Sequence, residues 1–228
     1  MMTSRLSTEE LRQFAENGHA VVASSLDCEA LHELGGLLDT SHAGVRNLLD
    51  VPVISQLARS NAVRDLVERV LGANCFAVRG ILFNKVNGAN WNVAWHQDCV
   101  IAVVERKEIP GWGPWSIKAG VHHVRPSSDL MSRMLAIRIH LDECGADNGP
   151  LRVLPGSHRE GFLSDKQIQE WPKAGAVTCV ANRGDAILMR PLLLHGSSVA
   201  KAPNVRRVVH FEFTADELPT GVQWRDRV

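Results

Sequence analysis

Two segments of the sequence alternate between apolar and polar residues so regularly that they constrain the fold of the whole chain. They cover residues 136–142 and 206–213, and side chains two positions apart on a β-strand point to the same face. One face is apolar apart from Arg207, and it carries Ile137, Ile139, Leu141, Val209, Phe211 and Phe213. The other face is polar, with Arg138, His140, Asp142, Arg206, His210 and Glu212. The apolar face can pack under helices, whereas the polar residues are of the types that line a wet cavity.

The polar face can be in contact with solvent or can line an enclosed lumen, and the N-terminal region helps to decide between the two. An antiparallel sheet with one face in water produces the same alternation. However, the chain begins with predicted helices that need a sheet to cover. A capping box from Ser7 to Glu10 opens a helix that ends at Gly18, and Asp27 and Asn61 cap two more. A barrel or jelly roll with a polar lumen meets both demands.

The rest of the chain is rich in predicted strands. After a short strand at 19–23, they occupy residues 75–86, 93–98, 134–141, 151–154, 176–180, 186–190 and 206–213. No repeat and no linker separates the helices from the strands. We therefore expect one α+β domain, mainly β, over residues 1–228. Its helical layer spans about residues 1–72 and packs on one sheet of a jelly-roll core at about residues 73–214.

Composition excludes several classes of protein. Lys and Arg together number 25, as do Asp and Glu, so no net positive field favours nucleic acid or an anionic membrane. No apolar run approaches the ~20 residues of a membrane span, and the N-terminus lacks the apolar core of a signal peptide. The five cysteines form no C-x-x-C pair, which is typical of a reducing compartment. We expect a cytoplasmic protein with no nucleic-acid or membrane partner and make no prediction of its oligomeric state.

The segment Trp95-His96-Gln97-Asp98 offers an imidazole and a carboxylate two residues apart. On a β-strand, His96 and Asp98 converge on one face while Gln97 turns away. A second candidate imidazole follows much later in the chain, at His195. Two histidines and one carboxylate are the ligands of the facial triad, which holds non-haem Fe(II) and leaves positions open for oxygen and a co-substrate. The H-x-D pattern alone occurs by chance in many chains, so the hypothesis depends on the residues around it.

Arg206 opens the last long strand, eleven residues after His195. If that strand runs back beside the first, the guanidinium can face the same cavity as the three ligands. A buried guanidinium needs an anion, and its planar fork suits a carboxylate bound through two hydrogen bonds. This is the arrangement that a dicarboxylate co-substrate requires, with one end on iron and the other held by arginine.

With these residues in place, the chain resembles the phytanoyl-CoA dioxygenase family of Fe(II)/2-oxoglutarate-dependent oxygenases. The resemblance covers most of the chain and rests on segments 82–85, 95–98, 148–158 and 195–197, followed by Arg206. The most specific motif is the segment 148–158, Asn-Gly-Pro-Leu-Arg-Val-Leu-Pro-Gly-Ser-His. The resemblance implies a double-stranded β-helix, or jelly roll, and it gives the H-x-D pattern most of its weight.

The resemblance also implies a ligand set. Iron would be bound by His96, Asp98 and His195, and the distal carboxylate of 2-oxoglutarate by Arg206 with Ser197 beside it. Three more residues are expected at the co-substrate: Ile81, Gln97 and Arg138. Ile81 falls where the family has an apolar pocket residue, and Arg138 falls where many members carry tryptophan. Arg46 lies near the position of a basic residue that the family supplies from its N-terminal region.

The implied reaction uses O2 to convert 2-oxoglutarate into succinate and CO2 and hydroxylates a C–H bond of a small molecule. Because Asp98 is present, the chain is not the halogenating variant of this fold, in which a small residue takes that position. The alternative is a cupin-like metal-containing protein that binds a small molecule without oxygenase activity. Against this alternative, the metal ligands and Arg206 occur together. A zinc hydrolase on the same ligands would lack an evident general base.

Substrate specificity is expected to come from residues 104–131, a long stretch with little periodicity. Trp112 and Trp115 lie there among glycines and prolines, either as a rigid apolar wall for the substrate or as part of a packed loop over the barrel mouth. The same stretch contains polar candidates for specificity, namely Lys118, His122, His123 and Arg125. The identity of the substrate does not follow from these residues.

Overall fold

The computed structural model describes residues 6–23, 26, 28–37, 44–85, 90, 92–201 and 205–228. The N-terminal elements are α1 (Thr8–Asn17), β1 (His19–Val22), α2 (Cys28–Leu37), β2 (Gly44–Val45), the 3-10 helix η1 (Leu48–Asp50), α3 (Pro52–Arg59) and α4 (Asn61–Leu71). The middle of the chain forms β3 (Phe76–Lys85), β4 (Val93–His96), β5 (Ile101–Val103), β6 (Trp115–Lys118), β7 (Val121–Val124) and α5 (Ser128–Arg133). The last elements are β8 (Leu135–His140), β9 (Leu151–Val153), η2 (Ser157–Glu160), α6 (Asp165–Glu170), β10 (Val177–Cys179), β11 (Ala186–Met189), β12 (His195–Ser197) and β13 (Arg206–Thr214).

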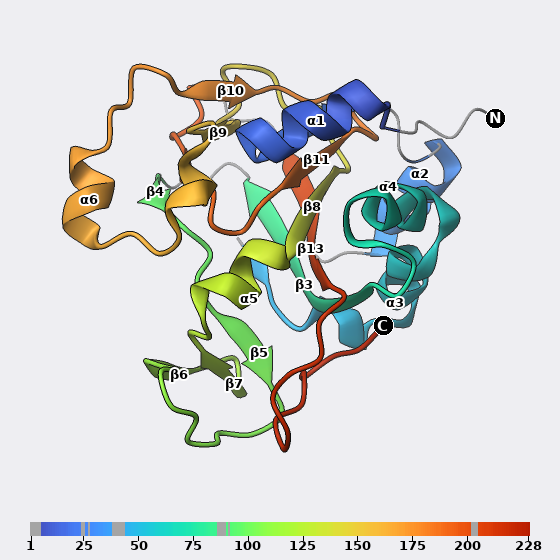
Figure 1. Ribbon diagram of the computed structural model, residues 1–228. Helices are drawn as coiled ribbons and strands as arrows, with labels where there is room; N and C mark the ends of the chain where they lie inside the picture. The colour runs from blue at the N-terminus through green and yellow to red at the C-terminus, as the bar shows by residue number, and fades with distance from the viewer. Residues whose placement is uncertain are drawn as a thin grey trace.

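Two antiparallel sheets build a double-stranded β-helix, which confirms the predicted jelly-roll fold. One has the strand order β1-β11-β8-β13-β3-β2 and the other the order β10-β9-β12-β4. In the larger sheet β13 lies between β8 and β3, so that His210 is opposite Arg138 on one side and Ile81 on the other. A third sheet, β5-β7-β6, lies at the end of the molecule away from β9 and β10 (Figure 1).

The largest apolar core lies between the N-terminal helices and the six-stranded sheet. Helices α2, α3 and α4 gather on one side of that sheet (Figure 1). Buried side chains of the N-terminal helices, α1 included, join those of the strands in one cluster, which includes Phe14, Ile54, Leu57, Val63, Leu66, Ile137, Ile139, Leu141, Val209, Phe211 and Phe213. The apolar face predicted for the two alternating strands is therefore confirmed. Among the described residues, no helix is long and apolar enough to cross a membrane.

Arg207, the exception on the apolar face, is neutralised by Asp142. Its Nε donates to Asp142 Oδ2 at 2.8 Å and its Nη2 to Oδ1 at 2.8 Å, while Nη1 donates to the backbone oxygen of Gly35 at 2.7 Å. Asp142 had been predicted to share the polar face with Arg138. It faces Arg207 and α2 instead, because β8 ends at His140 and the chain turns before Asp142.

The structure confirms one of the predicted helix caps and corrects another. The capping box is confirmed, since Ser7 Oγ accepts from the backbone nitrogen of Glu10 at 3.2 Å and the Glu10 carboxylate accepts from the backbone nitrogen of Ser7 at 2.7 Å. Asn61 is the first residue of α4, and the cap position belongs to Ser60. Asp27, the cap expected for the second helix, lies outside the described residues.

Residues 104–131 contain more regular structure than their pattern indicated. Strands β6 and β7 form a hairpin whose turn consists of Ala119 and Gly120, with φ angles of 48° and 76°. Positive φ at both positions is what a two-residue hairpin turn requires, but Ala-Gly is not a pair that signals it. Trp112 and Trp115 pack against a second apolar core, as expected of a packed loop.

We predict that Asp142→Ala lowers the free energy of unfolding by about 2 kcal/mol, because it leaves the Arg207 guanidinium beside an apolar core without a counter-ion. The cost is below that of a fully buried pair, since the two side chains keep 16% and 21% exposure. Asp147→Ala is the control: its ion pair with Lys201 is 67% and 85% exposed, and we expect a loss below about 0.5 kcal/mol. Urea denaturation measures both, and equal losses would contradict the assignment.

Candidate metal centre and co-substrate pocket

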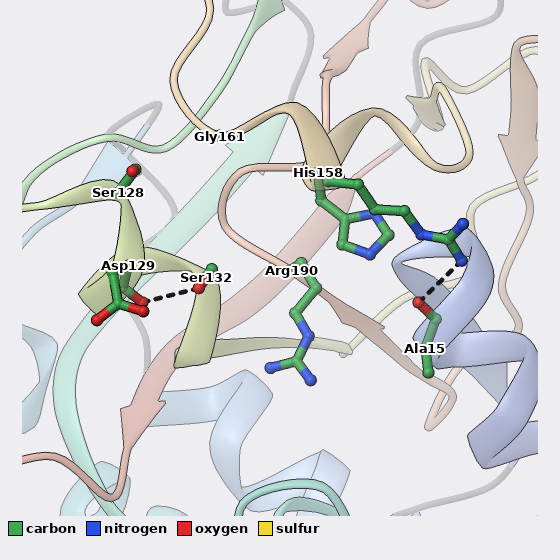
Figure 2. A pocket seen from close by; sticks show the side chains of 8 residues that line it. Ala15, Ser128, Asp129, Ser132, His158, Gly161 and Arg190 are labelled. Carbon is green, nitrogen blue, oxygen red and sulfur yellow. Dashed lines mark hydrogen bonds between the residues drawn. The ribbon is translucent and has the colours of Figure 1, made fainter.

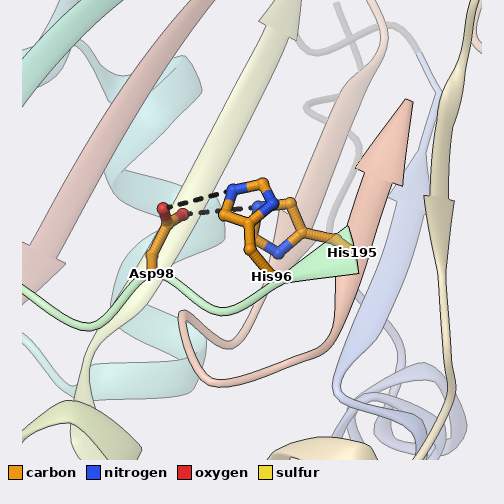
Figure 3. A group of neighbouring side chains, drawn as sticks. All are labelled: His96, Asp98 and His195. Atoms are coloured by element: carbon orange, nitrogen blue, oxygen red, sulfur yellow. Dashed lines mark ion pairs between the residues drawn. The ribbon is translucent and has the colours of Figure 1, made fainter. Parts of the chain in front are cut away.

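Strand pairing brings the three predicted metal ligands together. β12 pairs with β4 so that His195 lies opposite His96, and the two ring centroids are 4.2 Å apart. Asp98 follows the end of β4, where its backbone nitrogen donates to the backbone oxygen of Pro191 at 2.9 Å. Asp98 Oδ1 lies 3.9 Å from His96 Nε2, and Oδ2 lies 3.6 Å from His195 Nε2 (Figure 3). The ligand atoms of all three residues lie within 4.8 Å of one another.

Both histidines are held in the form that a metal ion needs. His96 Nδ1 lies 2.8 Å from the backbone oxygen of Ala94, and His195 Nδ1 lies 2.8 Å from that of Leu193. Since a carbonyl oxygen only accepts hydrogen bonds, each Nδ1 carries a proton, and Nε2 is the ring atom that remains for a metal ion. Such backbone contacts orient metal-binding imidazoles.

The electrostatics of the site favour the same protonation states. Burial lowers the pKa of His195 to about 4, so this imidazole is neutral at pH 7. Burial alone would raise the pKa of Asp98, but the neighbouring groups, led by His195 and His96, outweigh it and hold that pKa well below its usual range. A neutral imidazole and an ionised carboxylate are the states in which these groups bind a divalent metal ion.

The ligand cluster is covered on one side and open on the other. The His195 side chain is 5% exposed, whereas those of His96 and Asp98 are 40% and 29% exposed. A metal ion held on the open side would keep coordination positions free for small molecules, as a facial triad requires. The donor set, its geometry and its exposure therefore fit Fe(II).

The space next to the ligands is a cavity of about 90 Å³ lined from both sheets. Its lining consists of Phe83, Val93, His96, Asp98, Arg138, Leu151, His195, Gly196, Ser197 and Arg206. The structure thus brings the three ligands together with Arg206, Ser197 and Arg138, as the sequence predicted. Ile81 lies on the same face of β3 as Phe83 but is not part of this lining.

Arg206 is a buried cation without a carboxylate partner among the described residues. Its side chain contacts the backbone oxygen of Gly149 and lies 4.0 Å from Cys144 Sγ, both through Nη1. Burial raises the pKa of the Cys144 thiol, so this group stays neutral and supplies no charge. The Nε atom of Arg206 is buried and has no hydrogen-bond partner in the described part of the chain. A buried guanidinium in this state needs an anion, and a ligand carboxylate can supply it.

Lys85, which has no role among the sequence predictions, lies next to the cavity lining at Ser197. Its Nζ donates to Ser197 Oγ at 2.8 Å and to the backbone oxygen of Ser198 at 2.7 Å. Burial, and after it the charge of Arg206, lowers the pKa of Lys85 to about 8. The sequence held a signal for this position, because Lys85 lies two residues after Phe83 on the same strand and so on the face that lines the cavity. Lys85 therefore adds a second cation at the Arg206 end of the cavity.

Arg138 enters the cavity as expected. It stacks over the Phe83 ring at 4.9 Å from the centroid, and its Nη1 lies 3.5 Å from His210 Nδ1. Burial, followed by the charge of Arg206, lowers the pKa of Arg138 to about 10, so the guanidinium stays charged at neutral pH. Like Arg206, it has an Nε atom without a partner in the described residues. Arg138 thus adds a further cation to the cavity lining.

The prediction that Gln97 binds the co-substrate needs correction. Its Nε2 donates to the backbone oxygens of Gly161 at 2.9 Å and Leu192 at 2.7 Å, and its Oε1 accepts from the backbone nitrogen of Leu163 at 2.8 Å. The alternation that turns His96 into the cavity turns Gln97 away from it. Gln97 therefore connects the loop at residues 161–163 to the segment that precedes β12.

A second hollow, of about 500 Å³, lies beside α1, α5 and η2 (Figure 2). Its two arginines are engaged with backbone oxygens: Arg159 Nη2 donates to that of Ala15 at 3.4 Å, and Arg190 Nη1 to that of Met134 at 3.0 Å. None of the predicted site residues lines it. Although it is larger, its lining does not include the metal ligands, and the candidate site is the smaller cavity.

We predict that Gly196→Ala weakens metal binding about tenfold or more. A Cβ at this position would lie 2.8 Å from the backbone oxygen of Val93, so β12 and β4 would have to separate and pull the two histidines apart. Gly145→Ala is the control, since nothing lies within 4 Å of its added Cβ. Calorimetric titration with Co(II) measures both variants, with thermal melting to verify folding. Unchanged affinity in Gly196→Ala would contradict this account of the strand spacing.

The affinity for 2-oxoglutarate is predicted to fall about tenfold between pH 7 and pH 9, because the Lys85 ammonium loses its proton as the pH rises through about 8. Lys85→Met should bind weakly at pH 7 and lack this loss. Calorimetry on the metal-loaded protein across this range measures both. A wild-type affinity that stays constant to pH 9 would exclude Lys85 as a ligand.

Comparison with known proteins agrees with this geometry. The chain is 25% identical to the peroxisomal phytanoyl-CoA dioxygenase of Mus musculus over 168 residues, which cover 66% of this chain and 43% of that protein. It is 32% identical to the protein of the same name from Bos taurus over 103 residues, 39% of this chain and 29% of that one. The chain thus matches less than half the length of these relatives.

Solved structures share the fold at low sequence identity. HygX from Streptomyces hygroscopicus, solved with nickel and 2-oxoglutarate bound, superimposes with a TM-score of 0.67 at 15% identity, covering 95% of this chain and 88% of HygX. EctD from S. alaskensis, solved with 2-oxoglutarate and 5-hydroxyectoine, gives 0.68 at 20% identity, covering 94% and 78%. The family model described as phytanoyl-CoA dioxygenase (PhyH) matches residues 5–208, and this chain therefore belongs to that family.

Proposed function

We propose that this protein is an Fe(II)- and 2-oxoglutarate-dependent dioxygenase that hydroxylates a C–H bond of a small-molecule metabolite. One observation carries the proposal. The ligand atoms of His96, Asp98 and His195 lie within 4.8 Å of one another in the cavity that Arg206 also lines. Arg206 is a buried cation that has no carboxylate partner among the described residues. A metal ion and a dicarboxylate satisfy both ends of this cavity at once.

Each residue has a defined task in this proposal. The two imidazoles and the Asp98 carboxylate would hold Fe(II) through Nε2 and Oδ atoms, and Arg206 with Lys85 would bind the far carboxylate of 2-oxoglutarate. Ser197 receives a hydrogen bond from Lys85 and donates one to the backbone oxygen of Gly149 at 2.8 Å, which fixes the cation beside Arg206. When bound, iron and 2-oxoglutarate supply the activation of O2, with succinate and CO2 as products. The protein supplies position, charge and a pocket with little water.

The solved neighbours support the choice of ligands. HygX has been crystallised with iron and with nickel and 2-oxoglutarate, and EctD with iron and with 2-oxoglutarate and 5-hydroxyectoine. We further propose that the helical layer and the jelly roll act as one oxygenase unit. The free thiols of Cys75, Cys99, Cys144 and Cys179 are consistent with a reducing, cytoplasmic location.

His96→Ala is predicted to abolish succinate release from 2-oxoglutarate, because two ligands no longer hold the metal in the cavity. Arg206→Ala should instead raise the KM for 2-oxoglutarate by about tenfold or more, since it removes a charge-assisted hydrogen bond to the far carboxylate. Succinate release over a range of 2-oxoglutarate concentrations separates the two effects. If the Fe(II)-loaded wild-type protein binds 2-oxoglutarate but never turns it over with any member of a metabolite panel, it is a binding protein and not an oxygenase.

A further inference from the structure

A second group of cations surrounds Asp98 outside the co-substrate cavity. It consists of Arg46, Arg79 and Lys118, which come from three separate parts of the chain and do not line that cavity. Each of them interacts electrostatically with Asp98. Their positions follow from strand register and hydrogen bonds.

Arg79 is anchored one carboxylate away from the metal ligands. Its Nη1 lies 3.0 Å from Glu212 Oε1 and donates to the backbone oxygen of Val100 at 3.5 Å. Glu212 is 2% exposed, and its ligand atom lies within 4.8 Å of those of His210 and Asp98. The charge of Arg79 is therefore compensated by Glu212 and held at a fixed place beside the metal centre.

Arg46 and Lys118 each precede a residue that takes part in a hydrogen bond between two distant segments. Asn47 Nδ2 donates to the backbone oxygen of Ala119 at 3.3 Å, so the residue before Asn47 and the residue before Ala119 are held near each other. Val45, opposite Leu82 in the sheet, packs on the helical core. Arg46 follows the end of β2 and is exposed.

Neither Arg46 nor Lys118 has an ion pair or a side-chain hydrogen bond within the described part of the chain. Glu212 is occupied by Arg79, and Asp98 would give its charge to the metal ion. The buried imidazole of His123 supplies no negative charge, and burial, together with the charges of nearby cations, lowers its pKa. Burial and then the charge of Arg79 also lower the pKa values of Arg46 and Lys118. Two cations without a counter-ion thus remain beside the metal centre.

We propose that the substrate is an anion and that Arg46 and Lys118 bind its carboxylate or phosphate group. The inference rests on the proposed oxygenase function and names the class of its substrate. Arg46 is exposed and Lys118 partly exposed, so an oxyanion can reach both from solvent. Lys118 and Arg46 interact electrostatically, and a guanidinium and an ammonium near each other can bind such a group through charge-assisted hydrogen bonds. The hydrogen bond between Asn47 and Ala119 holds the two segments together, and the rest of the substrate would extend toward the open side of the metal ligands.

Calorimetric titration tests the proposal with three probes of equal chain length: hexanoate, hexyl phosphate and hexan-1-ol. The Fe(II)-loaded protein is kept without oxygen and saturated with 2-oxoglutarate, so that Arg206 and Lys85 are occupied. We expect at least one of the anions to bind and hexan-1-ol not to bind. Arg46→Gln and Lys118→Gln should each weaken anion binding about tenfold or more. Lys166→Gln is the matched control, because the Lys166 side chain is 81% exposed on α6. This variant should bind the anions with the affinity of the wild-type protein.

The outcomes are distinct. Preference for hexyl phosphate or for hexanoate tells which oxyanion the site selects. The proposal is overturned if neither anion binds, if hexan-1-ol binds as tightly, or if Arg46→Gln and Lys118→Gln bind the anions like Lys166→Gln. Failure of the oxygenase function is seen separately, as absence of 2-oxoglutarate binding in the same protein. In that case the anion titration is performed on the Arg206→Ala variant and is judged by the same three criteria.

Discussion

The pairing of β12 with β4 is the contact on which the whole site depends. It sets His195 opposite His96, although the two residues come from distant parts of the chain. Gly196 permits the close approach, since any Cβ there would meet the backbone oxygen of Val93. Each imidazole is then oriented by a backbone oxygen two residues earlier in the chain. The positions of both histidine ligands are therefore set by the backbone, through the pairing of β12 with β4.

The lumen is unusual in its charge. Arg206 and Arg138 both line a small cavity whose only carboxylate in the described residues is Asp98. Leaving buried cations uncompensated is costly, and proteins keep such groups where a ligand completes them. The jelly roll makes this arrangement possible, because its apolar faces pack against helices and free the inner faces for polar groups. Stability comes from one side of the six-stranded sheet and ligand binding from the other.

The sequence predicted those features that depend on local period. The alternation in residues 136–142 and 206–213 separated core from lumen, and it went wrong only at Asp142, where the strand ends early. Helix α3 is not among the predicted helices, although Pro52 in its first turn is a residue that favours a helix start. The role of Lys85 and the clamp made by Gln97 depend on which loops and strands meet them in space. Such long-range pairing has no local signature, and the ligand set accordingly required the family resemblance.

The most direct test of the account is anomalous X-ray diffraction from crystals grown without oxygen in the presence of Fe(II) and 2-oxoglutarate. We predict one iron peak at about 2 Å from Nε2 of His96, Nε2 of His195 and a carboxylate oxygen of Asp98. The far carboxylate of 2-oxoglutarate should lie against Arg206. Iron bound by other residues, or a 2-oxoglutarate molecule that leaves Arg206 without an anion, would contradict the account.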